Sequence, residues 1–181
     1  MNIQNSKENI QPLATGRNAE RLETALDAET NLESREEIER QRKALENAIK
    51  NYEGDDPLES WLEYIHFIEQ TFPKSGKEAK LDEILKKCLV KFEKKAQYDQ
   101  DPRFVRIFTK FIDSKKDPTR YYEKMYNSGK GSRVSEFYIA WAFYYDFIDN
   151  FEKAGKIYQK GLDARAEPVE QLKEAYTRFQ F

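Results

Sequence analysis

The residues best suited to chemistry are scarce in this sequence, which has one histidine, His66, and one cysteine, Cys88. Two such residues are too few soft ligands for a conventional zinc site. Cys88 lies in an apolar stripe with no histidine nearby in sequence, which is typical of a small buried residue rather than a nucleophile. His66 falls within the region of another apolar stripe and is interpreted as structural or incidental. The sequence has no glycine-rich phosphate loop, Gly-x-Ser-x-Gly turn or kinase signature, so we predict no enzyme, metal or cofactor in this region.

The strongest recognition signal is the triplet Lys7-Glu8-Asn9, placed in a polar segment ahead of the apolar part of the chain. It offers a cation, an anion and an amide that both donates and accepts, on consecutive residues. A rigid partner could recognise all three through charge-assisted and amide hydrogen bonds. Such a triplet arises by chance about once in several thousand residues at average composition. We therefore treat these three residues as a candidate partner-binding motif.

Composition argues for a protein-binding module. Thirty-one basic residues face 33 acidic ones, so the net charge of −2 gives little attraction for nucleic acid. Eight lysines lie between Lys74 and Lys95, but four acidic residues interrupt them. The mean hydropathy is −0.93 and no apolar run approaches the roughly 20 residues of a membrane span. The segment from Met1 to Gln11 lacks the apolar stretch of a secretory signal. From the charge balance we expect no nucleic acid as a partner, and from the hydropathy we expect no membrane.

Apolar residues recur every three or four positions in seven segments, which is the spacing of amphipathic helices. Asp56-Pro57, Asp101-Pro102 and Asp117-Pro118 each place a capping side chain before a proline, and Glu167-Pro168 is a weaker version. Each pair predicts a helix start, because proline loses no hydrogen bond in the first turn. No segment alternates for long with the period of two that strands require. We predict an all-α fold.

Two of the apolar stripes carry more specific predictions. Tyr121, Tyr122 and Met125 form a short stripe that we expect to face the core. The segment from Phe137 to Phe147 is apolar nearly all round and is predicted to be a central helix.

Similar patterns recur along the chain. Trp61 and Trp141 both begin a Trp-x-x-Tyr pattern and Phe108 stands at the equivalent place between them, with spacings of 47 and 33 residues. The second spacing is close to the period of about 34 residues of tetratricopeptide repeats. In the last repeat, Ala154 and Gly161 are expected to be small so that neighbouring helices can approach closely. An ordinary helical bundle is the alternative interpretation.

These patterns divide the chain into three parts. We expect residues 1–17 to form a flexible leader with the Lys-Glu-Asn triplet, and residues 18–53 to form a charged helix–loop–helix arm with thin apolar stripes. Residues 54–181 form about three tetratricopeptide-like helical hairpins, and the helix after Pro168 caps the stack. A single hairpin cannot bury its apolar face alone, so stacking supplies the core.

Several separated motifs, in the right order, resemble the N-terminal region of the Bub-related and Mad-type spindle-checkpoint proteins. The leader is similar to their N-terminal motif, and later matches fall in their repeat domain. The likeness spans residues 6 to about 180 and rests on these segments: Ser6 to Leu13, Gly16-Arg17, Gly54 to Trp61, Asp101 to Phe104, Phe137 to Ala142, and Ala166 to Pro168.

The resemblance implies a role in delaying anaphase from the kinetochore, nucleus and cytoplasm. Lys7, Glu8 and Asn9 match the family's Lys-Glu-Asn box, which binds the WD-repeat co-activator of the anaphase-promoting complex as a pseudosubstrate. The arm from about Leu13 and Arg17 would hold the co-activator together with a HORMA-domain checkpoint protein. The box favours the inhibitor branch over the checkpoint-kinase paralogue. The resemblance also implies that some full-length relatives carry further degron-like motifs and a kinase or pseudokinase domain.

The resemblance also implies an apolar surface on the middle repeat that docks a helical motif of the outer-kinetochore scaffold. Phe108 and Phe111 stand at matching positions, while Thr109 and Ser114 replace aliphatic residues of relatives and Lys115 adds a charge. Such a groove depends on a contiguous apolar strip, so Phe108 and Phe111 are equally well explained as core residues. A half-tetratricopeptide scaffold of RNA processing is the rival function.

Overall fold

The computed structural model describes residues 19–20, 32–72 and 80–181. The residues of these ranges form helices and no strand, with an isolated parallel bridge between Val134 and Glu167. The prediction of an all-α fold is confirmed. The chain divides into two compact units, residues 1–84 and 85–181, and each is described by itself. The predicted domain boundaries after residues 17 and 53 stay predictions.

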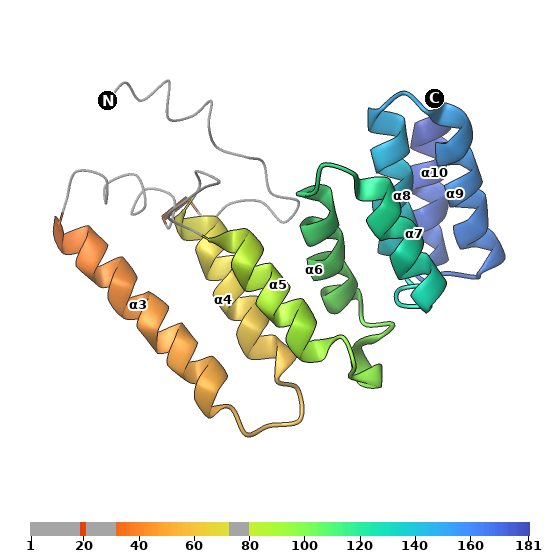
Figure 1. Ribbon diagram of the computed structural model, residues 1–181. Coiled ribbons are helices and arrows are strands. Elements are labelled where there is room, and N and C mark those ends of the chain that lie inside the picture. Colours follow the sequence, from red (N-terminus) through yellow and green to blue (C-terminus); the bar gives the residue numbers. More distant parts are fainter. Residues whose placement is uncertain (1–18, 21–31, 73–79) are drawn as a thin grey trace, which may run out of the picture. The chain divides into compact units, whose positions relative to one another are not determined.

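The first unit contains α3 (Leu32–Asn51), α4 (Leu58–Thr71) and the first turn of α5 (Leu81–Phe92). Figure 1 shows α3 and α4 side by side, and the Tyr64 hydroxyl of α4 donates to Glu46 of α3 at 2.8 Å. The guanidinium of Arg42 donates to the same hydroxyl at 3.4 Å. Ile38 is the one buried residue of α3, as its thin apolar stripe predicts. The first segment of the predicted arm lies largely outside the described residues.

The second unit contains the remainder of α5 and the helices that follow it. Within it, α6 packs on α7 and α8, α8 packs on α9 and α10, and α9 also contacts α10 (Figure 1). The elements after α5 are η1 (Ala96–Tyr98), α6 (Pro102–Asp113), α7 (Pro118–Ser128), α8 (Ser135–Phe147), α9 (Phe151–Asp163) and α10 (Val169–Gln180).

Proline marks the helix starts much as the sequence predicts. Asp101 caps α6, because its Oδ1 accepts from the backbone N–H of Arg103 at 2.9 Å and Pro102 is the first helical residue. Pro118 likewise begins α7, but the Asp117 side chain makes no capping hydrogen bond. The helices after Pro57 and Pro168 begin one residue later than expected, at Leu58 and Val169.

The core of the second unit is built from aromatic rings. Tyr122, Phe137, Tyr138 and Trp141 are all buried, and the rings of Tyr122 and Trp141 stack with centroids 6.2 Å apart. Such ring pairs contribute beyond the area that they bury. Aromatic side chains thus join α7 to α8.

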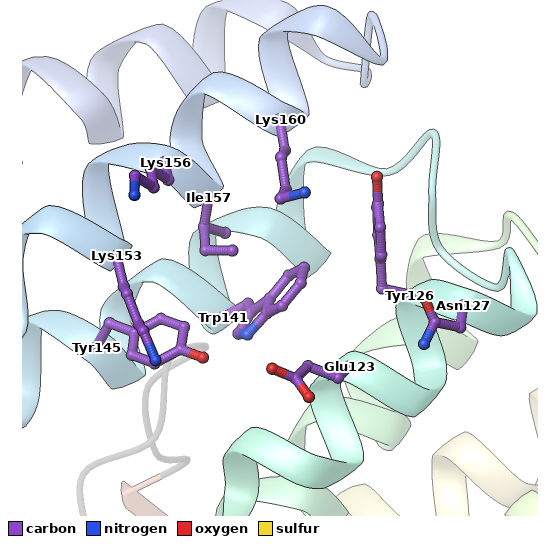
Figure 2. Close-up of a pocket in the computed structure, with 9 residues that line it drawn as sticks. All are labelled: Glu123, Tyr126, Asn127, Trp141, Tyr145, Lys153, Lys156, Ile157 and Lys160. Carbon is purple, nitrogen blue, oxygen red and sulfur yellow. The ribbon is translucent and has the colours of Figure 1, made fainter.

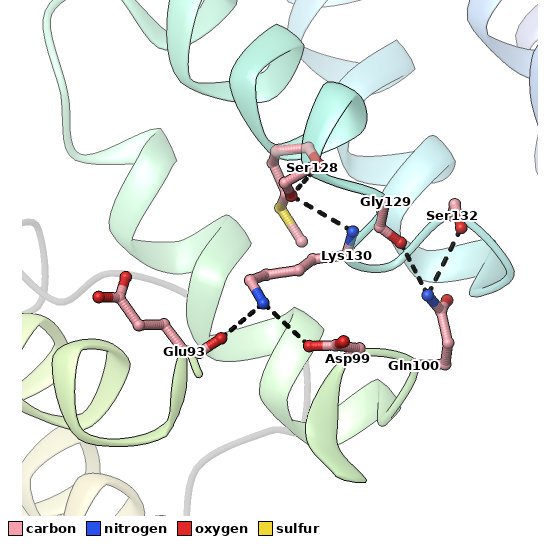
Figure 3. A network of polar contacts seen from close by, with 8 residues as sticks. Glu93, Asp99, Gln100, Ser128, Gly129, Lys130 and Ser132 are labelled. Atoms are coloured by element: carbon pink, nitrogen blue, oxygen red, sulfur yellow. Dashed lines mark hydrogen bonds and ion pairs between the residues drawn. The ribbon is translucent and has the colours of Figure 1, made fainter. Parts of the chain in front are cut away.

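A polar network fastens the loop between α7 and α8 to the segment before α6 (Figure 3). The Nζ of Lys130 donates to the Glu93 carbonyl and, at 2.9 Å, to the Asp99 carboxylate. The side chain of Gln100 donates to the Gly129 carbonyl at 2.7 Å and accepts from the Arg133 backbone N–H at 2.8 Å. These bonds satisfy backbone groups that the helix ends leave unpaired.

The prediction of a core position is wrong for two residues. Tyr121 is 40% exposed and Phe147 is 77% exposed. Tyr121 lies one position before Tyr122, so the helical turn directs it away from the covered face. The helix α8 is central in packing against three neighbours, but one of its faces remains uncovered.

Candidate functional site

The structure describes only part of the predicted site, whose binding roles stay predictions. Lys7, Glu8 and Asn9 lie outside the described residues. Phe108 and Phe111 lie on α6 of the second unit, where both are half-buried. The surface that contains them, with Thr109, Ser114 and Lys115, is called the α6 surface below.

Phe108 belongs partly to the core. Its ring meets that of Phe104 edge-on, with centroids 5.4 Å apart, and it packs against the buried cluster of the second unit. Phe104 itself is 1% exposed. Phe108 therefore offers a partner only the outer part of a ring whose inner part supports the fold.

Phe111 is covered by a cation. The Nζ of Lys115 lies 4.0 Å from the centroid of the Phe111 ring, within the range of a cation–π contact. An apolar partner helix must displace this ammonium group or place an acidic side chain beside it. The added charge that the sequence indicates thus sits directly on the predicted docking residue.

The two polar replacements have different surroundings. Thr109 is buried and its hydroxyl donates to the Arg106 carbonyl at 3.1 Å, so it is not part of the accessible surface. Ser114 is exposed at the end of α6, where its hydroxyl donates to the Phe111 carbonyl at 2.6 Å. Of the two, only Ser114 lowers the apolar character that a partner would meet.

A bidentate ion pair holds α6 against α8. The guanidinium of Arg106 donates to the two carboxylate oxygens of Glu136 at 2.7 and 3.0 Å, and this pairing raises the pKa of Arg106 despite partial burial. At the other end of α6 the Tyr122 hydroxyl donates to Asp113 at 2.7 Å. Desolvation raises the pKa of both groups.

Exposed apolar residues that the sequence interpretation missed lie at the junction of α8 and α9. Phe143 is 64% exposed and Phe147, one turn later, is 77% exposed. Ile148 and Phe151 follow at 47% and 56%. Exposed apolar patches of this kind often mark protein contacts. The signal in the sequence is that α8 is apolar nearly all round, which predicts a central helix and does not distinguish its covered faces from its uncovered one.

The described residues give no support for catalysis at the candidates named above. Cys88 is completely buried, and desolvation raises the pKa of its thiol to about 12, as expected of a structural residue. His66 is exposed. Across residues 32–72 and 80–181, no three histidine, cysteine, aspartate or glutamate side chains gather where they could hold a metal ion. Within the same part of the chain, no helix has the length and apolar character needed to cross a membrane.

The geometry is that of a helical scaffold with apolar contact surfaces, and the comparison of sequences decides which scaffold. A family model described as Mad3/BUB1 homology region 1 matches residues 40–162, more than half of the chain. The chain belongs to this family. The Mad3/BUB1 family consists of spindle-checkpoint proteins, and the matched region is a non-catalytic part of them.

Individual relatives agree with the family assignment. The chain is 36% identical over 175 residues to the human mitotic checkpoint serine/threonine-protein kinase BUB1 beta, which aligns with 97% of this chain. It is 33% identical over 132 residues to the mouse mitotic checkpoint serine/threonine-protein kinase BUB1, which aligns with 73% of this chain. The chain spans only 16% of the human relative and 12% of the mouse one.

A solved structure confirms the fold. The chain matches one chain of the crystal structure of the mitotic checkpoint complex with a TM-score of 0.86 and 28% identity, over 98% of this chain and 84% of that one. The expected tetratricopeptide-like, all-helical architecture of this family is thereby confirmed. The Mad3/BUB1 assignment also favours the checkpoint interpretation over the RNA-processing scaffold.

Proposed function

We propose that this Mad3/BUB1 region inhibits the anaphase-promoting complex by occupying its WD-repeat co-activator with the Lys-Glu-Asn box at Lys7, Glu8 and Asn9. The observation that carries the proposal is the box itself, placed ahead of homology region 1. The alignment with human BUB1 beta covers 97% of the chain, so it must include residues that precede residue 40. The mouse BUB1 alignment covers 73%. A larger share of the chain thus aligns with BUB1 beta than with BUB1, which supports the inhibitor branch of the family over the checkpoint-kinase paralogue.

The proposed mechanism is competitive occlusion by a tethered motif. Three residues bind weakly on their own, because they supply few contacts and the leader loses entropy when it docks. The arm and the repeat domain raise the effective concentration of the box by contributing further contacts. In this proposal the arm from about Leu13 and Arg17 holds the co-activator beside a HORMA-domain checkpoint protein. The likeness to a chain of the mitotic checkpoint complex supports such an assembly.

A second role concerns the α6 surface, which we propose as the docking site for a helical motif of an outer-kinetochore scaffold. Phe108 and Phe111 supply the apolar part of the surface, and Lys115 favours an acidic side chain on the partner. The proposed sites of action are therefore the kinetochore, the nucleus and the cytoplasm.

The deciding experiment is a pull-down of the purified co-activator propeller by this chain. Changing Lys7, Glu8 and Asn9 together to alanine should abolish capture. The matched control changes Gln171, Lys173 and Glu174 to alanine, which removes an amide, a cation and an anion from the exposed side of α10 and should leave capture intact.

Two results would count against the proposal. Equal capture by the triple-alanine chain and the unchanged chain would move the contact to the arm or the repeats. If neither chain captured the propeller, the inhibitor role would be lost, and the family assignment would remain.

A further inference from the structure

The second unit contains a groove that the proposed function does not use. It lies between α7, α8 and α9 and encloses about 330 Å³ (Figure 2). None of its lining residues belongs to the Lys-Glu-Asn box or the α6 surface. Its lining is Glu123, Tyr126, Asn127, Trp141, Tyr145, Lys153, Lys156, Ile157 and Lys160.

One wall of the groove carries a row of cations. Lys153, Lys156 and Lys160 project from successive turns of one face of α9 (Figure 2). Lys156 pairs with Glu152 at 3.1 Å. The other two ammonium groups lie over aromatic rings, Lys153 at 5.6 Å from the Tyr145 centroid and Lys160 at 5.0 Å from that of Tyr126. Among the described residues neither forms an ion pair, so both can receive an anionic ligand.

The aromatic floor contains a buried donor. Trp141 is 3% exposed, and within the described part of the chain its indole Nε1–H has no hydrogen-bond acceptor. Figure 2 shows this nitrogen on the side of the ring toward Tyr145 and Glu123. A buried donor without an acceptor is unfavourable, and a ligand that supplies an oxygen removes that penalty. Glu123 and Lys153, which also line the groove, are both exposed, and the proposal requires their side chains to turn aside for such an oxygen to reach the indole.

The opposite wall suits a peptide backbone. Asn127 of α7 is exposed, and its amide can donate to a carbonyl and accept from an N–H. Glu123 is the one carboxylate of the lining, against three ammonium groups, so the groove keeps a positive charge. Ile157 adds an aliphatic contact between the cations.

We propose that this groove binds an extended acidic segment of a partner protein. Lys153 and Lys160 pair with its carboxylates, the indole of Trp141 donates to one of its carbonyl oxygens, and an aliphatic side chain packs on Ile157. The row from Lys153 to Lys160 is about 10 Å long at the rise of an α-helix, a length that about three extended residues cover. A compact anion spans neither that length nor the apolar floor.

The test uses the whole chain and an array of short synthetic peptides in which Asp and Glu alternate with Leu. A matched array carries Asn and Gln in place of Asp and Glu. The chain should capture members of the acidic array and not their neutral counterparts. Lys153→Gln with Lys160→Gln should weaken the best affinity by about tenfold or more. The control, Lys86→Gln with Lys87→Gln, removes the same charge from exposed positions of α5 and should leave the affinity unchanged.

The variant Trp141→Phe tests the buried donor. It keeps an aromatic ring and removes the N–H, so peptide affinity should fall about threefold or more. The peptide-free variant no longer contains a buried donor without an acceptor. A lower thermal midpoint with unchanged affinity would make Trp141 purely structural and overturn its assigned role.

Other outcomes overturn the proposal that the groove binds an acidic segment. They are failure to capture any acidic peptide, equal capture of the neutral array, and equal weakening by the control pair of lysine changes. Tighter binding of a short single-stranded RNA that depends on Lys153 and Lys160 would identify a different class of ligand and equally defeat the proposal.

Discussion

Gly161 of α9 lies directly against the ring of Tyr138 of α8. A Cβ atom built at Gly161 would stand 2.8 Å from Tyr138 Cγ and 2.9 Å from Leu172 Cδ2 of α10. Contacts this short do not occur between real side chains, and Tyr138 and Leu172 are both fully buried. Three helices therefore meet where only a hydrogen atom fits.

Gly161→Ala should lower the free energy of unfolding. The change improves helix propensity by about 1 kcal/mol, but overpacking of a buried site costs roughly 1–3 kcal/mol. The two terms leave a net loss of up to about 2 kcal/mol, measured by urea unfolding followed by circular dichroism.

Gly155→Ala in the same helix is the matched control. The nearest atom to its added Cβ is Phe179 Cε1 at 3.9 Å, an ordinary contact. Here the gain in propensity is unopposed, so stability should rise by about 0.5–1 kcal/mol. If both variants changed stability in the same direction, the close approach at Gly161 would not be what fixes the spacing of these helices.

Lys130→Met should destabilise the second unit. The Lys130 side chain is 22% exposed, and its loss deprives the Glu93 carbonyl and the Asp99 carboxylate of a charged donor. We expect a loss of about 1–2 kcal/mol in urea unfolding, allowing for the partial exposure of both partners.

The control for Lys130 is Lys156→Met, which breaks a pair between one side chain 68% exposed and another 80% exposed. Exposed pairs of this kind contribute roughly 0–0.5 kcal/mol. A similar loss in both variants would mean that the network of Figure 3 adds no more than a surface ion pair.

Cys88 should resist alkylation well into the alkaline range. Burial raises the pKa of its thiol from 9.0 to about 12, so the reactive thiolate is scarce in the folded chain at pH 10. The rate of reaction with iodoacetamide at pH 10 should rise sharply when urea unfolds the chain. Rapid labelling of the folded chain would contradict the burial of this side chain.

The same shift predicts the direction of a stability change. Between pH 9 and 12 the unfolded chain releases the thiol proton and the folded chain retains it, so the unfolded state binds fewer protons. The stability contributed by Cys88 is therefore present below pH 9 and is lost as pH rises through that window. A variant with alanine at position 88 should lack this component, so its stability should fall less steeply than that of the unchanged chain.

Periodicity predicted the helices because their buried faces recur at the helical spacing, and the cap at Asp101 could be read from one dipeptide. It could not predict the outward face of α8. Phe143 and Phe147 have the same apolar character as the buried Phe137, and only the placement of α6, α9 and α10 decides which ring is covered. The groove beside Trp141 could not be predicted from the sequence either. Its lysines and aromatic rings come from three different helices, and the sequence does not show how those helices pack against one another.

The two phenylalanines of the α6 surface should separate docking from folding. Phe108→Ala removes a ring that packs edge-on against Phe104, so it should cost about 2–3 kcal/mol of stability, less than a fully buried ring. Phe111→Ala removes a half-buried ring beneath Lys115 and should cost about 1 kcal/mol.

Binding of a synthetic helical peptide from the outer-kinetochore scaffold, measured by calorimetry at a temperature where both variants stay folded, then isolates the docking role. Phe111→Ala should lower the affinity for the peptide by about tenfold or more, because a central aromatic contact is lost. Lys115→Ala uncovers the Phe111 ring. It should therefore raise the affinity for an apolar peptide and lower the affinity for a peptide with an acidic residue beside that ring. Unchanged affinity in Phe111→Ala together with lower stability would show that the α6 surface serves the fold alone.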